Sequence, residues 1–164
     1  MTHPTHADLG GLLDCLGAAA VDFLVVGGAA AVLHGAPTST VDLDIVPSLA
    51  SENLARLFAL LLELEAELRD PGLKGRPLSL EQLPTAGQLR LLTSLGPLDV
   101  LARLHDGRDY NSLVEHCVAF TDGKLKLRVI DLPTLIEIKA ATGRARDKLL
   151  VPLLLALQRE GRAP

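Results

Sequence analysis

The chain of 164 residues contains no tryptophan, and aromatic residues make up only 2% of it. A protein surface that stacks single-stranded bases depends on aromatic side chains, so their scarcity argues against that class of nucleic-acid binder. Basic residues are not in excess either, because the formal net charge is -4 at pH 7 and the isoelectric point is about 5.7. Any contact with RNA or DNA must therefore come from a local patch of the surface.

Cysteine and long apolar runs are also scarce. Cys15 and Cys117 lie far apart and lack the close spacing of a zinc site or a redox pair, so we expect two free thiols packed as small core residues in a reducing cytoplasm. No apolar run approaches the roughly 20 residues of a membrane helix. Residues 1–9 lack the basic and apolar regions of a signal peptide. The sequence therefore predicts a cytoplasmic protein with no membrane contact.

Hydrophobic residues make up 48% of the chain, which is enough for one domain with a proper core and too little length for two ordinary ones. We expect a single domain over residues 1–164. Its core would span about residues 7–131, and a C-terminal helical extension would span about residues 132–161.

The most informative stretch is residues 22–46. An apolar run from Phe23 to Val26 is stopped by Gly27-Gly28, which predicts a buried strand turning into a short helix over Ala29 to His34. The free N–H groups at the start of that helix, unobstructed at the two glycines, would suit a phosphate. A tight turn without a ligand explains the same dipeptide.

Polar and apolar residues alternate strictly from Val41 to Val46. With a side-chain period of two along a strand, Asp42 and Asp44 share one face. Two carboxylates placed just past a possible phosphate site would suit divalent metal ions that bridge to a nucleoside triphosphate.

This order of features resembles the DNA polymerase β-like nucleotidyltransferase superfamily. The sequence VVGGAAAVLHG at residues 25–35 resembles the corresponding segment in the branch that contains the AbiEii/AbiGii-type toxins. The resemblance implies a third carboxylate on a neighbouring strand, and Asp99 between Leu98 and Val100 supplies one. It also implies transfer of a nucleoside monophosphate from an NTP to an acceptor hydroxyl. Asp42, Asp44 and Asp99 would hold Mg²⁺ or Mn²⁺, and Asp99 would help to deprotonate the hydroxyl.

The resemblance further implies a nucleotide-binding set, in which the Gly27-Gly28 backbone grips the phosphates and Lys139 contacts the triphosphate. Lys139 could equally be a solvated residue near a helix C-terminus. The residues Thr38, Ser39 and Thr40 could bind phosphate or cap the turn before the aspartates. By the same resemblance Asp147 would hold the next turn or a basic partner. His34, at a helix end, is expected to be structural rather than a general base.

The remaining elements complete an α/β fold of the nucleotidyltransferase type, a mixed sheet flanked by helices. A helix capped by Ser48 or Ser51 should carry its apolar stripe through Leu68 and end at Asp70-Pro71-Gly72. A loop over residues 71–88, with a short turn at 80–83, should follow. We expect the other helices at residues 7–20, 109–115, 132–142 and 146–159, and the other strands at residues 89–93, 98–103, 116–120 and 124–130.

The last of these helices should bend or restart at Pro152. Its run from Leu149 to Leu157 is apolar on nearly every face. Such a helix is either central to the fold or part of a homodimer interface.

The sequence does not identify the acceptor substrate. It could be tRNA, as in the AbiEii-like toxins, in which case a cognate antitoxin protein should exist. A protein hydroxyl or a small molecule such as an aminoglycoside would also serve. The alternative is a nucleotide-binding or regulatory module that has lost turnover, which the lack of an arginine in residues 37–40 favours and the intact aspartate trio opposes. A third possibility is a structural dimerising module.

Overall fold

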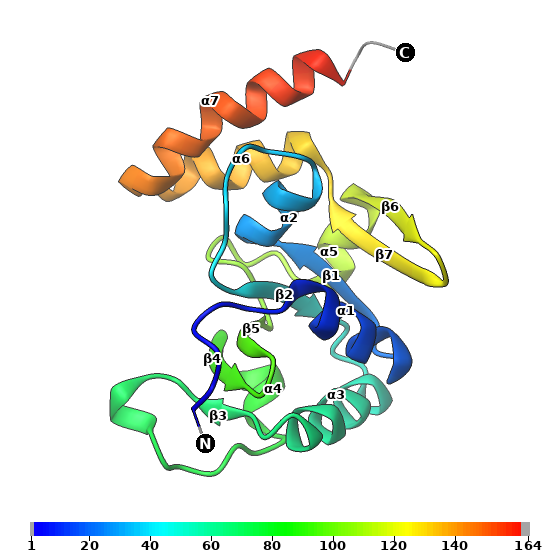
Figure 1. Cartoon of the computed structure of the whole chain (residues 1–164), viewed down its shortest axis with the longest axis vertical. Coiled ribbons are helices and arrows are strands. Elements are labelled where there is room, and N and C mark those ends of the chain that lie inside the picture. The colour runs from blue at the N-terminus through cyan, green and yellow to red at the C-terminus, as the bar shows by residue number, and fades with distance from the viewer. Residues whose placement is uncertain (1, 162–164) are drawn as a thin grey trace.

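A computed structural model describes residues 2–161 and has one seven-stranded mixed sheet, with the strand order β3-β4-β5-β2-β1-β7-β6 (Figure 1). The strands are β1 (Phe23–Val26), β2 (Leu43–Pro47), β3 (Glu67–Leu68), β4 (Gln88–Thr93), β5 (Gly96–Leu101), β6 (Cys117–Asp122) and β7 (Leu125–Ile130). The helices are α1 (Leu9–Ala18), α2 (Gly27–Leu33), α3 (Ser51–Glu63), α4 (Gln82–Thr85), α5 (Tyr110–Leu113), α6 (Leu132–Thr142) and α7 (Ala145–Glu160), with 3₁₀ turns η1 (Pro71–Leu73) and η2 (Val114–His116). The predicted α/β class is confirmed.

The centre of the sheet joins segments that are distant in the sequence. β2 pairs antiparallel with β1 and parallel with β5, so Asp44 lies beside Val26 on one side and beside Asp99 on the other. Parallel pairing requires a long crossover, which α3, β3 and β4 provide here. This pairing brings the aspartates of two separate strands to the same level of the sheet.

Helices lie on both sides of the sheet (Figure 1). Helices α1 and α3 contact each other on one side, whereas α2, α6 and α7 form a stack in which α7 is outermost. Fully buried residues from these layers form the core, among them Leu16 of α1, Leu24 of β1, Ile45 of β2 and Leu57 of α3. The aspartates therefore stand on a sheet fixed by packing from its other face.

Two elements have the predicted boundaries. The strand at Phe23–Val26 is followed at once by α2, and α6 spans Leu132–Thr142. Asp131 caps α6 by accepting a hydrogen bond from the Thr134 amide, and Gly143 ends it with a left-handed φ of 69°. Local signals therefore fixed both elements.

The prediction for α3 is wrong at both ends. Its N-cap is Ala50, and neither Ser48 nor Ser51 provides a side-chain cap. The helix ends at Glu63 rather than at Asp70-Pro71-Gly72, because Glu65 adopts a positive φ of 53° and turns the chain into β3. Leu68 therefore belongs to an edge strand of the sheet and not to the apolar stripe of the helix.

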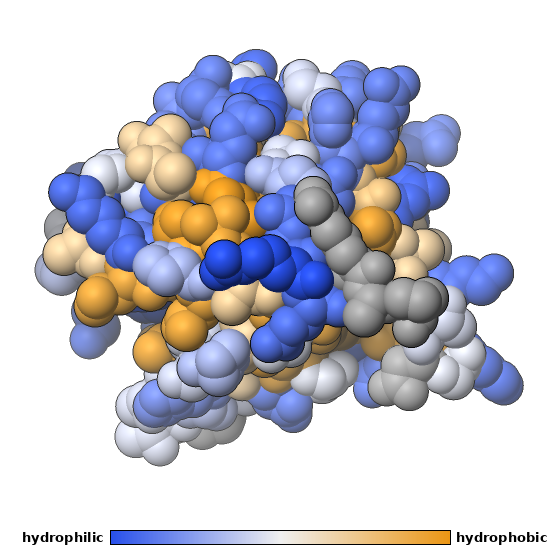
Figure 2. All heavy atoms as spheres, turned by 90° about the horizontal axis from the view of Figure 1, so that it is seen from above, coloured by the Kyte–Doolittle hydropathy of each residue, from blue (hydrophilic) through white to orange (hydrophobic). Residues whose placement is uncertain are grey.

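Helix α7 runs continuously from Ala145 to Glu160 with Pro152 inside it, so it does not restart there. It is also not central to the fold, because Leu149, Leu153 and Leu155 are 77%, 38% and 40% exposed. Figure 2 looks down on this side of the molecule and shows hydrophobic side chains at the surface among hydrophilic ones. Of the two expectations for this helix, only the homodimer interface stays open.

Two further expectations concern the chain as a whole. Cys15 and Cys117 are free and partly buried, and burial, followed by the charge of Asp131, raises the pKa of the Cys117 thiol to about 11. Within residues 2–161, no helix has the length and apolar character needed to cross a membrane.

Candidate active site

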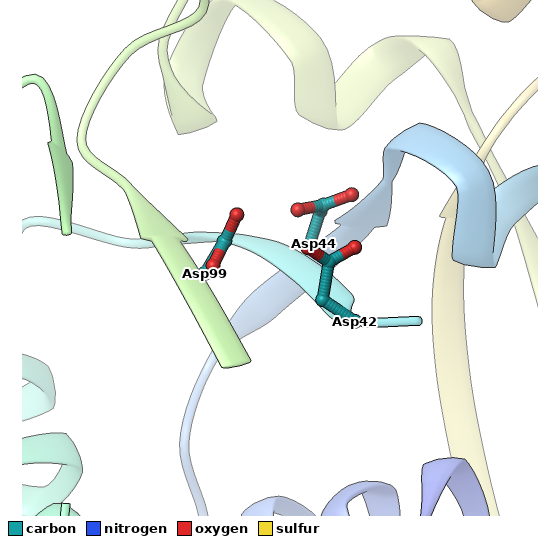
Figure 3. A group of neighbouring side chains, drawn as sticks. All are labelled: Asp42, Asp44 and Asp99. Carbon is teal, nitrogen blue, oxygen red and sulfur yellow. The ribbon is translucent and has the colours of Figure 1, made fainter. Parts of the chain in front are cut away.

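Three carboxylates meet where β2 and β5 lie side by side (Figure 3). Asp44 lies within β2, Asp42 lies just before its first residue, and Asp99 lies in the middle of β5. One oxygen from each of the three lies within 4.8 Å of the others. The sequence prediction that these three residues come together is therefore correct in its geometry.

Burial and mutual repulsion make this cluster costly when all three carboxylates are ionised. Burial, then the charges of Asp42 and Asp99, raise the pKa of Asp44 to about 8, although the charge of Lys139 acts in the opposite direction. Burial, then Asp42, also raises the pKa of Asp99, with Arg69 and Gln88 offsetting part of this effect. A cation placed between the carboxylates would relieve both burial and repulsion.

Gly27 and Gly28 are required by close packing around the aspartates. Gly27 has a φ of +66°, and a Cβ at this position would collide with the carboxylate of Asp44. A Cβ on Gly28 would lie 2.9 Å from the Thr40 hydroxyl. Both glycines also line the cleft described below, so their backbone faces the aspartates. Tight packing accounts for the dipeptide, and its role in phosphate binding stays a prediction.

The turn before the aspartates is organised by Thr40, whose hydroxyl donates a hydrogen bond of 3.0 Å to the Asp42 carbonyl. This is the turn-capping alternative for that residue. Thr38 and Ser39 are exposed, and the residues that line the cleft include none of the three. A ring nitrogen of His34 lies 2.7 Å from the Ile130 carbonyl, and the ring packs edge-on against Phe120. His34 therefore has a structural role, as predicted.

Lys139 is buried in the wall of the cleft and is not the solvated helix end that one interpretation predicted. Its ammonium lies 3.2 Å from Oδ1 of Asp147, and the two side chains are only 9% and 4% exposed. Asp147 also accepts hydrogen bonds from the Thr142 hydroxyl at 2.6 Å and from Nε of Arg144 at 2.9 Å. Burial opposes ionisation of Asp147, but these hydrogen bonds and charges outweigh it and lower its pKa. Asp147 thus holds both the turn and its basic partners.

An arginine that sequence reasoning missed contacts the aspartates directly. Nη2 of Arg69 lies 2.6 Å from Oδ1 of Asp99 and 3.5 Å from Oδ2 of Asp42. Gln88 donates a hydrogen bond of 3.1 Å to the other oxygen of Asp99. The alternating patterns Glu67-Leu68-Arg69 and Gln88-Leu89-Arg90 were the available signal, because in a strand they place the polar side chains on the face of Asp99.

The register of the sheet explains how Arg69 reaches the cluster. Arg90 of β4 lies opposite Asp99 of β5 in the sheet. The Arg69 amide donates a hydrogen bond of 2.8 Å to the Arg90 carbonyl, which continues the β3–β4 register by one residue. Directly opposed residues in a sheet project to the same face. A row therefore crosses the sheet from Asp44 through Asp99 and Arg90 to Arg69.

The cluster lies in a cleft of about 1060 Å³. The α6–α7 region contributes Lys139, Arg144 and Arg146 to the lining of the cleft, and β4 and the residues after β5 contribute Arg90 and Arg103. Apolar residues complete the lining: Val26, Leu101, Leu104, Ile130, Leu135 and Ile138. A cleft of this size with acidic groups surrounded by cations can hold a nucleotide together with a second molecule.

No family model matches the chain, and no curated protein matches it in sequence. Its fold does match solved structures. The lincosamide antibiotic adenylyltransferase LnuA, solved with lincomycin bound, aligns with a TM-score of 0.64 at 12% identity over 94% of this chain and 99% of its own. The chain has a nucleotidyltransferase fold. TM1012 of Thermotoga maritima, assigned as a nucleotidyltransferase, aligns with a TM-score of 0.55 at 19% identity over 90% of each chain.

The donor set of this nucleotidyltransferase fold suits a divalent cation. Asp42, Asp44 and Asp99 offer only carboxylate oxygens, the ligands that Mg²⁺ and Mn²⁺ prefer. Burial and the neighbouring charges of Asp42 and Asp99 raise the pKa of Asp44, and a bound cation would oppose both effects. The three aspartates could therefore hold a metal ion, whereas the assignment to the AbiEii-like branch stays a prediction.

Proposed function

We propose that this protein is a metal-dependent nucleotidyltransferase that moves a nucleoside monophosphate from an NTP to an acceptor hydroxyl and releases pyrophosphate. The observation that carries the proposal is the cluster of Asp42, Asp44 and Asp99, within 4.8 Å of one another and set in a cleft on a nucleotidyltransferase fold. Phosphoryl chemistry of this kind depends mainly on positioning and on neutralising charge, which such a cluster is built to do.

Each residue has a proposed role. Asp42 and Asp44 would hold two Mg²⁺ or Mn²⁺ ions and Asp99 would complete the second ion's site; bound there, the ions would supply Lewis-acid stabilisation of the phosphates. Asp99 also accepts the proton of the attacking hydroxyl, a role consistent with its raised pKa. Lys139, fixed by Asp147 in the cleft wall, binds the triphosphate. The Gly27-Gly28 backbone grips the phosphates, with Thr38, Ser39 and Thr40 as the remaining candidates.

The charge of the cleft reduces the number of candidate acceptors. Arg90, Arg103, Arg144 and Arg146 line it, so a polycationic acceptor such as an aminoglycoside is disfavoured. The cations suit the 3′ end of a tRNA, which would agree with an AbiEii-like toxin and a cognate antitoxin. The apolar lining suits a small hydroxylated molecule, and LnuA was solved with lincomycin bound. A protein hydroxyl is the third candidate.

The test is Mn²⁺-dependent incorporation of each α-labelled NTP into total tRNA, into the protein itself and into small hydroxyl acceptors. We expect transfer to one acceptor class by the wild type and at least a hundredfold loss in Asp44→Asn, the scale of a removed transition-state contact. Asp14→Asn, at an exposed position on α1, is the matched control and should retain transfer. Equal transfer by wild type and Asp44→Asn would contradict the proposal.

A second candidate function is a nucleotide-binding or regulatory module of the same fold. The ion pair of Arg69 with Asp99 favours it, since a bound guanidinium occupies an oxygen that a metal ion would need. This module would bind NTP saturably in the presence of Mn²⁺ and transfer no label to any acceptor.

A further inference from the structure

Arg69 neutralises the part of the aspartate cluster that faces β4. Its Nη2 lies between Asp99, at 2.6 Å, and Asp42, at 3.5 Å, and makes no ion pair with Asp44 among residues 2–161. The cluster is therefore unequal: Asp99 is held closely by Arg69 and Gln88, whereas Asp42 has only the longer contact with Arg69.

A divalent ion bound to Oδ1 of Asp99 would share that oxygen with the hydrogen bond from Nη2 of Arg69. The two cations would also repel each other at short range in a partly buried site. Binding of metal at Asp99 and pairing of Arg69 with Asp99 therefore disfavour each other.

The surroundings of Arg69 allow its side chain to move away from the aspartates. Its side chain is 21% exposed, its contact with Asp42 is long, and its Nε is buried without a hydrogen-bond partner in the described part of the chain. A buried donor without a partner lowers the stability of this arrangement, and a move towards solvent would satisfy it. The residue directly follows the two-residue edge strand β3 and precedes the largely exposed segment 71–81, so little packing opposes the movement.

We propose that Arg69 competes with a divalent ion mainly for Asp99, so that the Asp99 half of the site binds metal more weakly while the guanidinium is paired there. The inference rests on the proposed metal-dependent function and adds a positioning residue to it. Its consequence is two unequal classes of metal site: a tighter one at Asp42 and Asp44, and a weaker one that includes Asp99.

The experiment measures Mn²⁺ bound to the full chain by electron paramagnetic resonance of the free ion, without NTP. We expect Arg69→Gln to tighten the weaker site by about tenfold or more, because one positive charge beside the ion is removed. Arg69→Lys keeps the positive charge on a more mobile head group, so its Mn²⁺ affinity at the weaker site should lie between those of the wild type and Arg69→Gln. Arg90→Gln, next in the same row but half exposed and paired with Asp70, should change the affinity less than about twofold.

The outcomes separate this inference from the proposed function. Two Mn²⁺ classes in the wild type, with no tightening in Arg69→Gln, would show that Arg69 only holds the carboxylates in place and would overturn the competition. A weaker site in Arg69→Gln would overturn it too. No Mn²⁺ binding by any variant, including the wild type, would overturn both. Arg69→Lys keeps the test valid if Arg69→Gln does not fold, because competition predicts tightening in that variant as well.

Discussion

Among single residues, Asp44 should make the largest contribution to the pH dependence of the free energy of unfolding. Burial and two neighbouring carboxylates raise its pKa to about 8 in the folded chain, whereas its ordinary value is 3.8. Between these values the folded chain keeps a proton that the unfolded chain has released. The contribution of Asp44 to the free energy of unfolding is therefore full below about pH 4 and is lost as pH rises to about 8.

We expect Asp44→Asn to remove this pH dependence. With EDTA present at pH 8, the variant should exceed the wild type in free energy of unfolding by roughly 1–3 kcal/mol, because a neutral amide avoids the burial and repulsion of the carboxylate. Urea titrations at pH 5 and pH 8 measure the effect, with the exposed Asp14→Asn as control. A variant less stable than the wild type at pH 8 would show that the ionised Asp44 carboxylate makes net stabilising contacts in the fold.

Gly27 combines a backbone constraint with a close approach to Asp44. Gly27→Ala should cost about 1–2 kcal/mol for its positive φ and should also weaken Mn²⁺ binding, since the added methyl group displaces the carboxylate. Gly35→Ala is the matched control, because Gly35 also has a positive φ, of 93°, but has nothing within 4 Å. Loss of stability in both variants and loss of Mn²⁺ affinity only in Gly27→Ala is the expected pattern, measured by thermal melts and Mn²⁺ titration. Unchanged affinity in Gly27→Ala would refute the steric argument.

The residues of the site differ in how far the sequence could predict them. Asp42 and Asp44 follow from a two-residue alternation, which is local. Asp99 came only through the family resemblance, because its pairing with Asp44 spans two strands far apart in the chain. Arg69 contacts Asp99 across thirty residues. The sequence prediction placed Arg69 at the end of a helix, so the alternation Glu67-Leu68-Arg69 was not interpreted as a strand.

At the level of elements, the junction of α6 and α7 depends on one buried ion pair. Asp147→Asn leaves the Lys139 ammonium buried without its charge partner and should lower the free energy of unfolding by about 3–5 kcal/mol. Glu137→Gln on α6, the helix of Lys139, breaks an exposed ion pair with Arg108 and should cost under about 1 kcal/mol. Urea denaturation of both variants makes the comparison. Similar small losses would show that water solvates the Lys139 ammonium.

The same pair predicts sensitivity to acid. Because the pKa of Asp147 is lowered on folding, its contribution to stability is full above about pH 4 and is lost as pH falls further. Asp147→Asn should therefore lose less stability than the wild type between pH 5 and pH 3. An equal loss in both proteins would assign the acid sensitivity to other carboxylates.

Elements with local end signals could be predicted, and those without them could not. Gly27-Gly28 stops the first strand, and Pro133 and Gly143 bound α6, so these elements were found from sequence. The end of α3 at Glu63 has no glycine or proline, because Glu65 takes the positive φ that glycine normally supplies. The apolar residues Leu64 and Leu68 continued the helical period past that point, and tertiary packing placed Leu68 in the sheet instead.

For the whole molecule, the exposed leucines of α7 predict association. Leu149 and Leu153 lie one turn apart on this outer helix, and we expect them to form a homodimer interface. The double change Leu149→Glu and Leu153→Glu should give a monomer in sedimentation velocity, whereas Leu62→Glu, an exposed leucine on α3, should leave the dimer intact. A wild type that sediments as a monomer at concentrations of about 100 μM would contradict the interface.

A nucleotidyltransferase breaks the bond between the α- and β-phosphates of the NTP, and the fate of labelled phosphates shows which bond is broken. The wild type is supplied with Mn²⁺ and with NTP labelled on either the α- or the γ-phosphate, together with the acceptor that takes up label. Nucleotidyl transfer predicts that α-label enters the acceptor and γ-label leaves in pyrophosphate, with at least about a hundredfold loss in Asp42→Ala. Entry of γ-label into the acceptor, or α-label transfer that survives Asp42→Ala, would contradict the account.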